Sequence, residues 1–246
     1  YIAPKTVREA VAALKAHPDA MLLAGGTDVL VRMKARVWTP DVVVDIGRIA
    51  GGGDLKFNRK TGLHIGPGVT MRQIELSPQV GTNFAAVAQG ASVVGSIQIR
   101  NLATVVGNVC NAAPSADTAP GLIALGAKVQ IAGPGGRRSM LVENFMTGPS
   151  QTALKPGELV TGIQVPTPGP RTGSAYVRHT PRNAMDIAVV GVGAAVTLAP
   201  RTGACQDAKI VLGAVAPTPI RARAAEKILR GQKPTDALIA EAAEIA

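Results

Sequence analysis

A pair of glycines cuts off an apolar run that would otherwise continue as a strand. In "AMLLAGGTDVLV" the run is followed by Ala24, Gly25, Gly26, Thr27 and Asp28. Glycine lets backbone N–H groups approach an anion without a Cβ in the way, and a threonine hydroxyl adds a further donor. This stop predicts a turn that holds a phosphate group. A purely structural Gly-Gly turn between a strand and a helix is the alternative.

A second small-residue stretch, "TVVGN", has the same character. It contains Thr104, Gly107 and Asn108, and nine residues beyond Asn108 comes Asp117, a lone acid in an almost uncharged segment. A dinucleotide would account for both turns and the acid, because two turns can hold a diphosphate from two sides while a carboxylate accepts bonds from ribose hydroxyls. No G-x-G-x-x-G pattern follows a predicted strand, which argues against a Rossmann domain.

Length and composition indicate a globular protein. The chain has 246 residues with 46% hydrophobic content, enough to bury a core in one large domain or in two to three small ones. The longest apolar stretch, residues 187–198, contains two glycines and a threonine and is too short to cross a bilayer. We therefore expect no membrane span and a cytoplasmic location.

The net charge of +10 raises the question of nucleic-acid binding. Residues 1–170 carry 16 basic and 10 acidic side chains and residues 171–246 carry 10 and 6, so no dense basic arm exists. Aromatic content of 2% leaves few stacking platforms for bases. The charge favours anionic cofactors or acidic partner surfaces instead. Cys110 and Cys205 form no C-x-x-C pair, so we expect no metal or iron–sulfur site on this chain.

Helical and strand patterns alternate along the first two thirds of the chain. Helices are predicted over 6–17, where Thr6 and Glu9 form a capping box, over 70–75, where Thr70 and Gln73 do the same, and over 82–91. A helical turn is predicted over 29–36, and a helix with Pro120 in its first turn over 119–127. Strands are predicted over 20–26, 41–47, 62–66 and around Ile163 and Val165, with a hairpin over 128–140 that turns at 133–136.

The last third begins after a linker at residues 166–174 that is rich in proline and glycine. Residues 185–200 and 208–217 predict an antiparallel strand pair, and residues 221–231 predict a helix closed by Gly231. A last helix begins near Pro234 and is still in mid-pattern at Ala246, so we expect this end to be incomplete.

Four motifs in this order carry a resemblance. They are "LLAGGTDVLVRMK", "IRNLATVVGNVCNAAPSADTAPGLIALGA", "LKPGELVTGIQVP" and "RHTPRNAMDIAVVGVGAAV". Together they resemble the FAD-binding medium subunit of the molybdenum hydroxylases, the xanthine dehydrogenase and aerobic carbon monoxide dehydrogenase family. The resemblance spans nearly the whole chain, and four linked motifs are far more specific than any one of them.

The resemblance implies an α+β fold. It implies a vanillyl-alcohol-oxidase-type (PCMH-type) FAD-binding domain over 1–168, in two subdomains of about 1–54 and 55–168. A C-terminal domain like that of the carbon monoxide dehydrogenase flavoprotein, a three-stranded antiparallel sheet with helices, would follow over 172–246.

The resemblance also implies an oxidoreductase role without a catalytic acid, base or nucleophile on this chain. Such a subunit binds FAD non-covalently, takes electrons from a molybdenum-pterin cofactor on a large subunit through [2Fe-2S] clusters on a small subunit, and passes them to NAD, oxygen or a quinone. A dimer of heterotrimers is the implied assembly. The alternative is a self-standing FAD-dependent oxidoreductase of the same fold, for which the sequence offers no compelling acid or base.

Individual site residues follow from the same resemblance. Ala24 to Asp28 match the first diphosphate loop, and Thr104 to Asn108 match the second, with Thr104, Gly107 and Asn108 as its contact residues. Asp117 matches an acid that holds the FAD ribose. Val160 matches an aliphatic residue that bonds the flavin through its backbone.

Two further matches concern the flavin ring, and one departure affects the second loop. Tyr176 falls where an aromatic residue shields the ring, and Arg178 falls where some relatives have lysine near the flavin N1 and O2 edge. Arginine keeps the positive charge but changes the geometry. Val106 stands where glycine is common, and its Cβ leaves less room if that position needs a positive φ.

Overall fold

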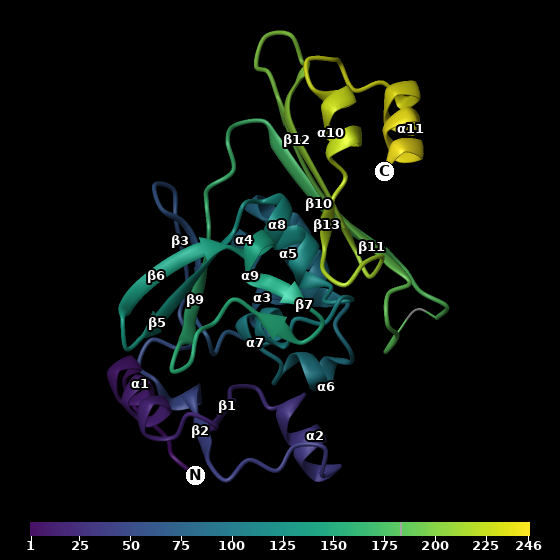
Figure 1. Ribbon diagram of the computed structural model, residues 1–246. Coiled ribbons are helices and arrows are strands. Elements are labelled where there is room, and N and C mark those ends of the chain that lie inside the picture. The colour runs from purple at the N-terminus through teal and green to yellow at the C-terminus, as the bar shows by residue number, and fades with distance from the viewer. Residues whose placement is uncertain (183) are drawn as a thin grey trace.

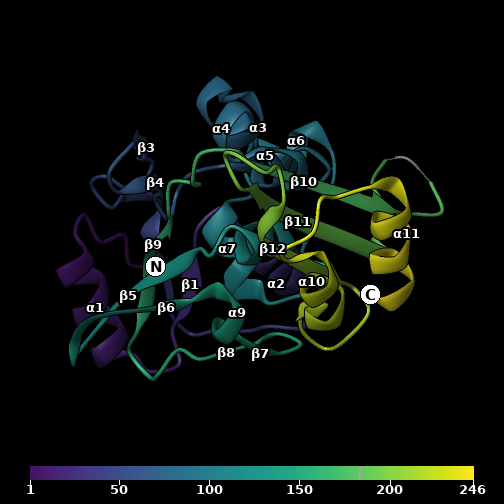
Figure 2. The same ribbon diagram turned by 90° about the horizontal axis from the view of Figure 1, so that it is seen from above.

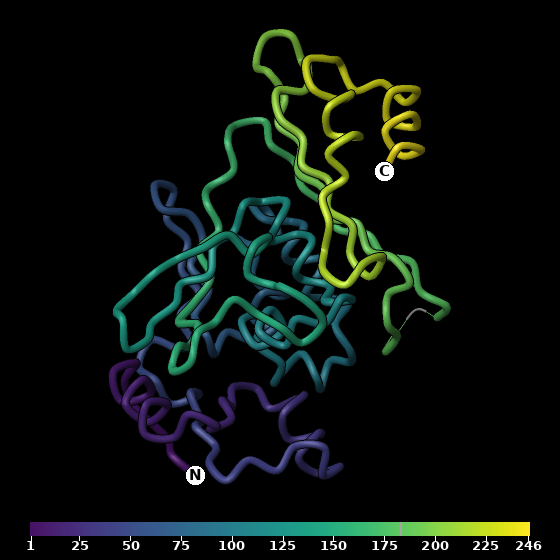
Figure 3. Tube along the Cα trace, viewed as in Figure 1, coloured from purple at the N-terminus to yellow at the C-terminus, as the bar shows by residue number. Residues whose placement is uncertain are grey.

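The structure of the protein is a computed structural model that describes residues 1–182 and 184–246. Figure 3 traces the chain from its N-terminal end at the bottom, through a central body, to the C-terminal helices at the upper right. No helix in the described part of the chain is long and apolar enough to cross a membrane.

The first part of the chain is a small β-α-β arrangement. Its elements are α1 (Val7–Ala16), β1 (Met21–Leu23), α2 (Val29–Lys34), β2 (Val43–Asp45) and the 3-10 helix η1 (Ile46–Arg48). Strands β1 and β2 pair in parallel, and α1 is capped by Thr6, whose side chain accepts from the Glu9 N–H. Ala10, Leu14, Val44 and Ile46 belong to a hydrophobic cluster that also includes Leu159 of the central body. The predicted strands and helices of this region are therefore confirmed.

The central body combines a five-stranded sheet with a group of short helices (Figure 1). The sheet has the order β3-β4-β9-β5-β6 with antiparallel pairing throughout. Its strands are β3 (Leu55–Asn58), β4 (Gly62–Ile65), β5 (Lys128–Gly133), β6 (Gly136–Leu141) and β9 (Leu159–Val165), while β7 (Met146–Gly148) and β8 (Gln151–Thr152) form a separate pair. The helices are α3 (Met71–Leu76), α4 (Pro78–Asn83), α5 (Ala85–Ser92), α6 (Ile97–Arg100), α7 (Val105–Asn111), α8 (Thr118–Ala124) and α9 (Val142–Phe145).

The C-terminal lobe is a second antiparallel sheet with two helices. Strands β10 (Thr172–His179), β11 (Val190–Leu198), β12 (Cys205–Gly213) and β13 (Ile220–Arg221) form the sheet in that order, and α10 (Arg223–Leu229) and α11 (Asp236–Ile245) follow. Figure 2 shows α10 and α11 at one side of the molecule and α1 at the other. Helix α10 packs on β12, where Ala208 and Leu229 share a small core.

The inner face of the C-terminal sheet packs directly on the central helices. Strand β10 contacts α5, and β11 contacts α8. At Gly193 of β11 an added Cβ would lie 2.5 Å from the carbonyl carbon of Pro120, so only glycine permits this backbone approach. Tyr176, Ala195 and Val211 of the sheet join the central core. The site described below lies next to this junction.

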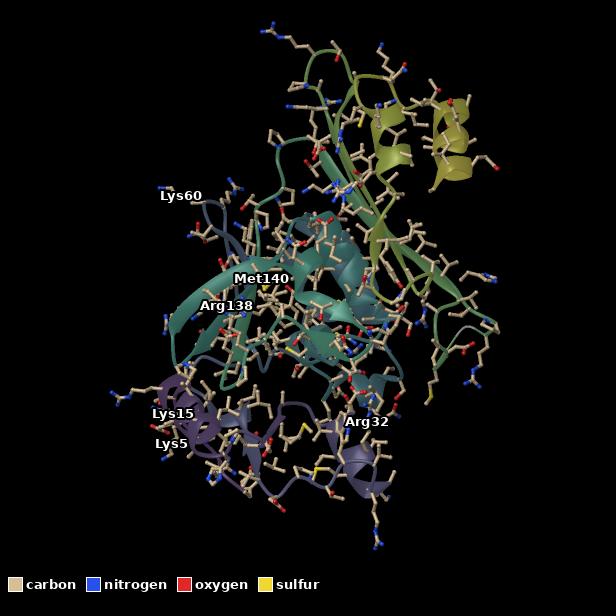
Figure 4. The ribbon with its side chains drawn as sticks, in the orientation of Figure 1. Lys5, Lys15, Arg32, Lys60, Arg138 and Met140 are labelled. Atoms are coloured by element: carbon tan, nitrogen blue, oxygen red, sulfur yellow. The ribbon has the colours of Figure 1, made fainter. Side chains whose placement is uncertain are left out.

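The structure confirms the α+β fold class and corrects several details. The linker predicted over 166–174 already contains the start of β10, and the C-terminal sheet gains a fourth, two-residue strand, β13. The helix predicted over 82–91 is divided at Phe84 into α4 and α5, because Phe84 leaves helical geometry with φ −137° and ψ 47°. On β6, Arg138 lies beside Met140 and pairs with Glu158 (Figure 4).

Candidate functional site

The first turn, defined as residues 24–28, connects β1 to α2. Gly26 has a φ of +74°, which a residue with a Cβ rarely adopts. Among the described residues, no hydrogen-bond partner is seen for the backbone N–H groups of Gly25, Gly26, Thr27 and Asp28. The first turn therefore presents consecutive free donors, and the Thr27 hydroxyl lies with them.

The second stretch is the beginning of helix α7 rather than a loop. Thr104 is its N-cap, and the Thr104 Oγ1 accepts from the Gly107 N–H at 3.0 Å. A Cβ on Gly107 would lie 2.7 Å from that same oxygen, so glycine makes room for the cap. The Gly107 N–H is thus already used. The concern about Val106 does not apply, since Val106 is helical and has no positive φ.

The two stretches are in contact although they are far apart in the chain. A Cβ added at Gly25 would overlap the carbonyl oxygen of Leu102 and would lie 3.1 Å from the Cα of Ala103. The segment that contacts Gly25 leads directly into the Thr104 cap. In Figure 1, β1 and α2 lie below α6 and α7. The first turn and the start of α7 therefore border the same region.

Two asparagines of α7 connect this region further. The Asn111 Nδ2 donates to the Asp28 Oδ1 at 3.2 Å, and the Asn108 Oδ1 accepts from the Thr118 hydroxyl at 2.6 Å. Thr118 directly follows Asp117. Helix α7 thus joins the first turn on one side to the segment of Asp117 on the other.

Asp117, Tyr176 and Arg178 form what we call the buried cluster. The Tyr176 hydroxyl donates to the Asp117 Oδ1 at 2.7 Å, and the Arg178 Nη1 forms an ion pair with the Asp117 Oδ2 at 2.9 Å. The side chains of Asp117 and Arg178 are only 10% and 8% exposed. The Arg178 Nη1 also donates to the Asp186 carbonyl oxygen, and within the described residues its Nε and Nη2 have no partner.

Burial governs the titration of this cluster. It raises the pKa of Asp117 above its ordinary value, and the Tyr176 hydroxyl and the Arg178 charge only partly oppose this rise. The pKa of Tyr176 is also raised, first by burial and then by the neighbouring carboxylate. Tyr176 therefore remains a hydrogen-bond donor at neutral pH, and its partner is Asp117.

Val160 lies on β9 beside a β-bulge. Gln130 pairs with Gly162 whereas Ile131 pairs with Val160, so Thr161 is an extra residue on β9. The pairing of β9 with β4 covers only residues 163–165, which leaves the backbone of Val160 unpaired on that side. The Val160 side chain is buried in the central core. The whole residue is 3% exposed, and a bond from its backbone to a ligand stays a prediction.

Comparison with known proteins decides the family. The family model described as "FAD binding domain in molybdopterin dehydrogenase" matches residues 1–168, and the one described as "CO dehydrogenase flavoprotein C-terminal domain" matches residues 175–246. The chain belongs to this family of molybdopterin dehydrogenase FAD-binding proteins. The recognition made from the four sequence motifs is therefore confirmed, and so are the oxidoreductase class and FAD as the cofactor.

Individual relatives of this family support the same assignment. The chain is 34% identical to the xanthine dehydrogenase FAD-binding subunit of Escherichia coli O157:H7, over 92% of this chain and 77% of the relative. It is 35% identical to the carbon monoxide dehydrogenase medium chain of Afipia carboxidovorans, over 94% of this chain and 79% of the relative. The solved carbon monoxide dehydrogenase of Hydrogenophaga pseudoflava matches with a TM-score of 0.93 and 33% identity, covering 100% of this chain and 85% of that one.

The chemistry of the donors fits the FAD of this family. A diphosphate offers only acceptor oxygens, and the first turn offers the N–H groups of residues 25–28 and the Thr27 hydroxyl as donors, while the Asp28 Oδ1 accepts from Asn111. Arg178 adds a buried positive charge with two uncommitted N–H-bearing nitrogens among the described residues. The residues present therefore suit an anionic dinucleotide.

The structure brings most of the predicted site residues into one connected region and gives some of them additional tasks. Thr104 caps α7, Asn108 bonds Thr118, and Tyr176 bonds Asp117. Contacts of the predicted residues with FAD itself stay predictions. For Tyr176 the hydroxyl donates to Asp117 and the residue is 6% exposed, and its shielding of the flavin ring stays a prediction.

Three supporting residues were missed by the sequence analysis. Asn111 and Thr118 carry the amide and hydroxyl contacts just described, and the Gln89 Oε1 of α5 accepts from the Tyr176 N–H at 2.7 Å. The repeated asparagines in "GNVCNAA" are the one signal that pointed to Asn111. Gln89 and Thr118 carry no such pattern, because their tasks arise from packing.

Proposed function

We propose that the chain is the FAD-binding electron-transfer subunit of a molybdenum hydroxylase assembly. It would receive electrons from a molybdenum cofactor on a large subunit, through [2Fe-2S] clusters on a small subunit, and pass them to NAD, oxygen or a quinone. The main support is the meeting of the first turn with the start of α7, where Gly25 contacts the backbone of Leu102 and Ala103. At this junction the free N–H groups of the first turn, beside the start of α7, match the acceptor oxygens of a diphosphate.

In this proposal the backbone of residues 24–28 binds the diphosphate without a covalent link. Thr104, Gly107 and Asn108 border the same phosphates, and Thr104 keeps the start of α7 in place through its cap. When bound, FAD supplies the electron-transfer chemistry, so the chain needs no acid, base or nucleophile of its own.

The buried cluster would serve the ribose and flavin end. Asp117 accepts bonds from hydroxyls of the ligand, and Arg178 presents its positive charge toward the electron-rich edge of the ring. Tyr176 fixes the Asp117 carboxylate from the other side. The unpaired backbone of Val160, beside the β-bulge, contributes a bond to the ring.

The domain division is part of the proposal. FAD binding belongs to residues 1–168, with subdomains of about 1–54 and 55–168, and residues 172–246 form the C-terminal domain. Support comes from the family-model limits at 168 and 175, and from a hydrophobic cluster whose buried residues all belong to the first subdomain except Leu159. A cytoplasmic location is also proposed. Free thiols at Cys110 and Cys205 suit a reducing compartment.

Purification of the native protein from its source tests the proposal. We expect it to copurify with two other chains, in a dimer of heterotrimers, and to show flavin absorption near about 450 nm. Size measurement and mass spectrometry identify the chains. A lone chain that carries out full substrate turnover would instead establish the self-standing oxidoreductase, and a purified assembly without flavin would contradict the FAD role.

A further inference from the structure

Helix α2 and the first turn are weakly attached to the rest of the protein. None of the six residues of α2 is buried, and Leu30 and Val31 are 51% and 62% exposed. Such a helix gains little from burial of apolar surface. The close approach of Gly25 to Leu102 and Ala103 is a steric fit between backbones and supplies no strong attraction.

Within the part of the chain that the structure describes, a single hydrogen bond links this segment to α7. Among the described residues, hydrogen bonds made by residues 24–38 stay within that segment, apart from the one between Asp28 and Asn111. This bond joins a carboxylate to an amide, and hydrogen bonds to charged groups are stronger than neutral ones. We call the Asp28–Asn111 bond the tether.

We propose that Asn111 is a positioning residue that holds the first turn closed against the start of α7 through the tether. The inference rests on the proposed role of the first turn in binding a diphosphate. Without the tether, the free N–H groups of residues 25–28 no longer face the same region as α7 for most of the time. The bound ligand would then have to order the turn, which lowers its affinity.

The tether assigns a task to the one acid in the first turn. A carboxylate repels a nearby diphosphate through its negative charge, so the place of the Asp28 side chain relative to the phosphates affects binding. The Asn111 amide turns the Asp28 Oδ1 into a structural acceptor, while the backbone of the same residue keeps its N–H free. Asp28 thus acts on the ligand through its backbone and on the protein through its side chain.

Hydrogen exchange on the flavin-free protein tests the tether itself. In Asn111→Ala and in Asp28→Ala, the amides of Leu30 and Arg32, which donate to the Gly26 and Asp28 carbonyls, should exchange about three- to ten-fold faster, the range expected for one hydrogen bond. The double variant should exchange no faster than either single variant. Asn101→Ala is the matched control, since Asn101 is an exposed asparagine close to the site with no side-chain bond among the described residues. Unchanged exchange in Asn111→Ala, or additive effects in the double variant, would overturn the tether.

The exchanged pair, Asp28→Asn with Asn111→Asp, provides the rescue. It restores an amide-to-carboxylate bond with the partners reversed, so exchange should return to near the wild-type rate. A merely structural need for asparagine on α7 would leave this variant as loose as the single ones.

Titration of FAD into the same flavin-free variants separates the tether from the proposed function. We expect the single variants to bind FAD about three- to ten-fold more weakly and the exchanged pair to recover. If exchange rises but FAD affinity is unchanged, the tether exists and the diphosphate role of the first turn is wrong. If affinity falls without a change in exchange, Asn111 contacts the ligand directly and the positioning role is wrong.

Discussion

The first turn and the buried cluster border the same site but are constructed in opposite ways. The first turn offers backbone donors on a segment where α2 buries none of its residues. The buried cluster consists of side chains that are almost fully enclosed and already bonded to each other. Backbone donors on a lightly packed segment depend on a few contacts to stay in place, whereas a buried charge needs partners inside the core. The difference teaches that one site can combine a lightly held part and a densely packed part.

The largest expected effect is in the buried cluster. Asp117→Leu leaves the Arg178 guanidinium buried without a counter-charge, so the free energy of unfolding should fall by about 3 kcal/mol. Urea denaturation of the flavin-free protein measures it. The double variant Asp117→Leu with Arg178→Met removes the unpaired charge and should regain most of the loss. A single variant as stable as the wild type would show that the cluster is not preorganised.

The first turn should respond in ligand affinity rather than in stability. In Gly25→Ala the new Cβ overlaps the Leu102 carbonyl and pushes the turn away from α7. We expect FAD affinity to fall roughly ten- to a hundred-fold, the cost of forcing extra atoms into a close contact. Gly53→Ala is the control, because an added Cβ there meets nothing within 4 Å. Equal flavin retention in Gly25→Ala and Gly53→Ala would show that the close approach of the first turn to α7 is not needed for FAD binding.

Tyr176→Phe removes one hydrogen bond from the buried cluster, and its effect on the free energy of unfolding should depend on pH. Loss of the hydroxyl should lower the free energy of unfolding at neutral pH by about 1.5 kcal/mol. The pKa of Asp117 is already raised above its ordinary 3.8 by burial, so its contribution to stability declines as pH rises from 3.8 through the raised pKa. Removal of the Tyr176 hydrogen bond raises the pKa of Asp117 further, so the free energy of unfolding continues to fall up to a higher pH.

The difference in the free energy of unfolding between Tyr176→Phe and the wild type should therefore be smallest below pH 3.8 and largest at neutral pH. Denaturant midpoints measured at a series of pH values show it. A difference that is constant with pH would mean that the hydroxyl does not act on the carboxylate.

The smallest effect concerns the cap of α7. Thr104→Ala removes the side-chain acceptor of the Gly107 N–H and should lower the free energy of unfolding by about 1 kcal/mol, with weaker FAD binding. Thr235→Ala removes an equivalent cap from α11, far along the chain, and should cost similar stability without changing FAD affinity. If both variants bind FAD equally well, the start of α7 does not contribute to the site.

The fold was predictable where local signals were strong. Thr70 and Gln73 correctly predicted the start of α3, and the glycines at 133 and 136 correctly predicted the turn between β5 and β6. Gly231, which has a positive φ, follows α10 as predicted. Strand β10 was missed because its first residues read as a linker. It is a strand because it pairs with β11 and because Gln89 accepts its Tyr176 N–H, and neither cause is local.

The site was predictable residue by residue but not in its contacts. Family resemblance pointed to Asp117 and Tyr176 separately, yet their bond depends on how β10 packs on α5. Likewise, Thr104 was expected in a loop. The helix that it starts depends on a glycine three residues later that leaves space for the threonine oxygen. Pattern identifies residue types, while tertiary packing decides which of them meet.

Gly193 has a practical consequence for dissecting this protein. Because β11 contacts the backbone of Pro120 at that glycine, cutting the chain at residues 166–174 would not give two pieces that each keep an intact core. The shorter piece would lose the surface against which its sheet rests, and the longer piece would expose to water the helices that now shelter Tyr176. Truncation experiments on this chain would therefore report on a broken core rather than on an isolated module.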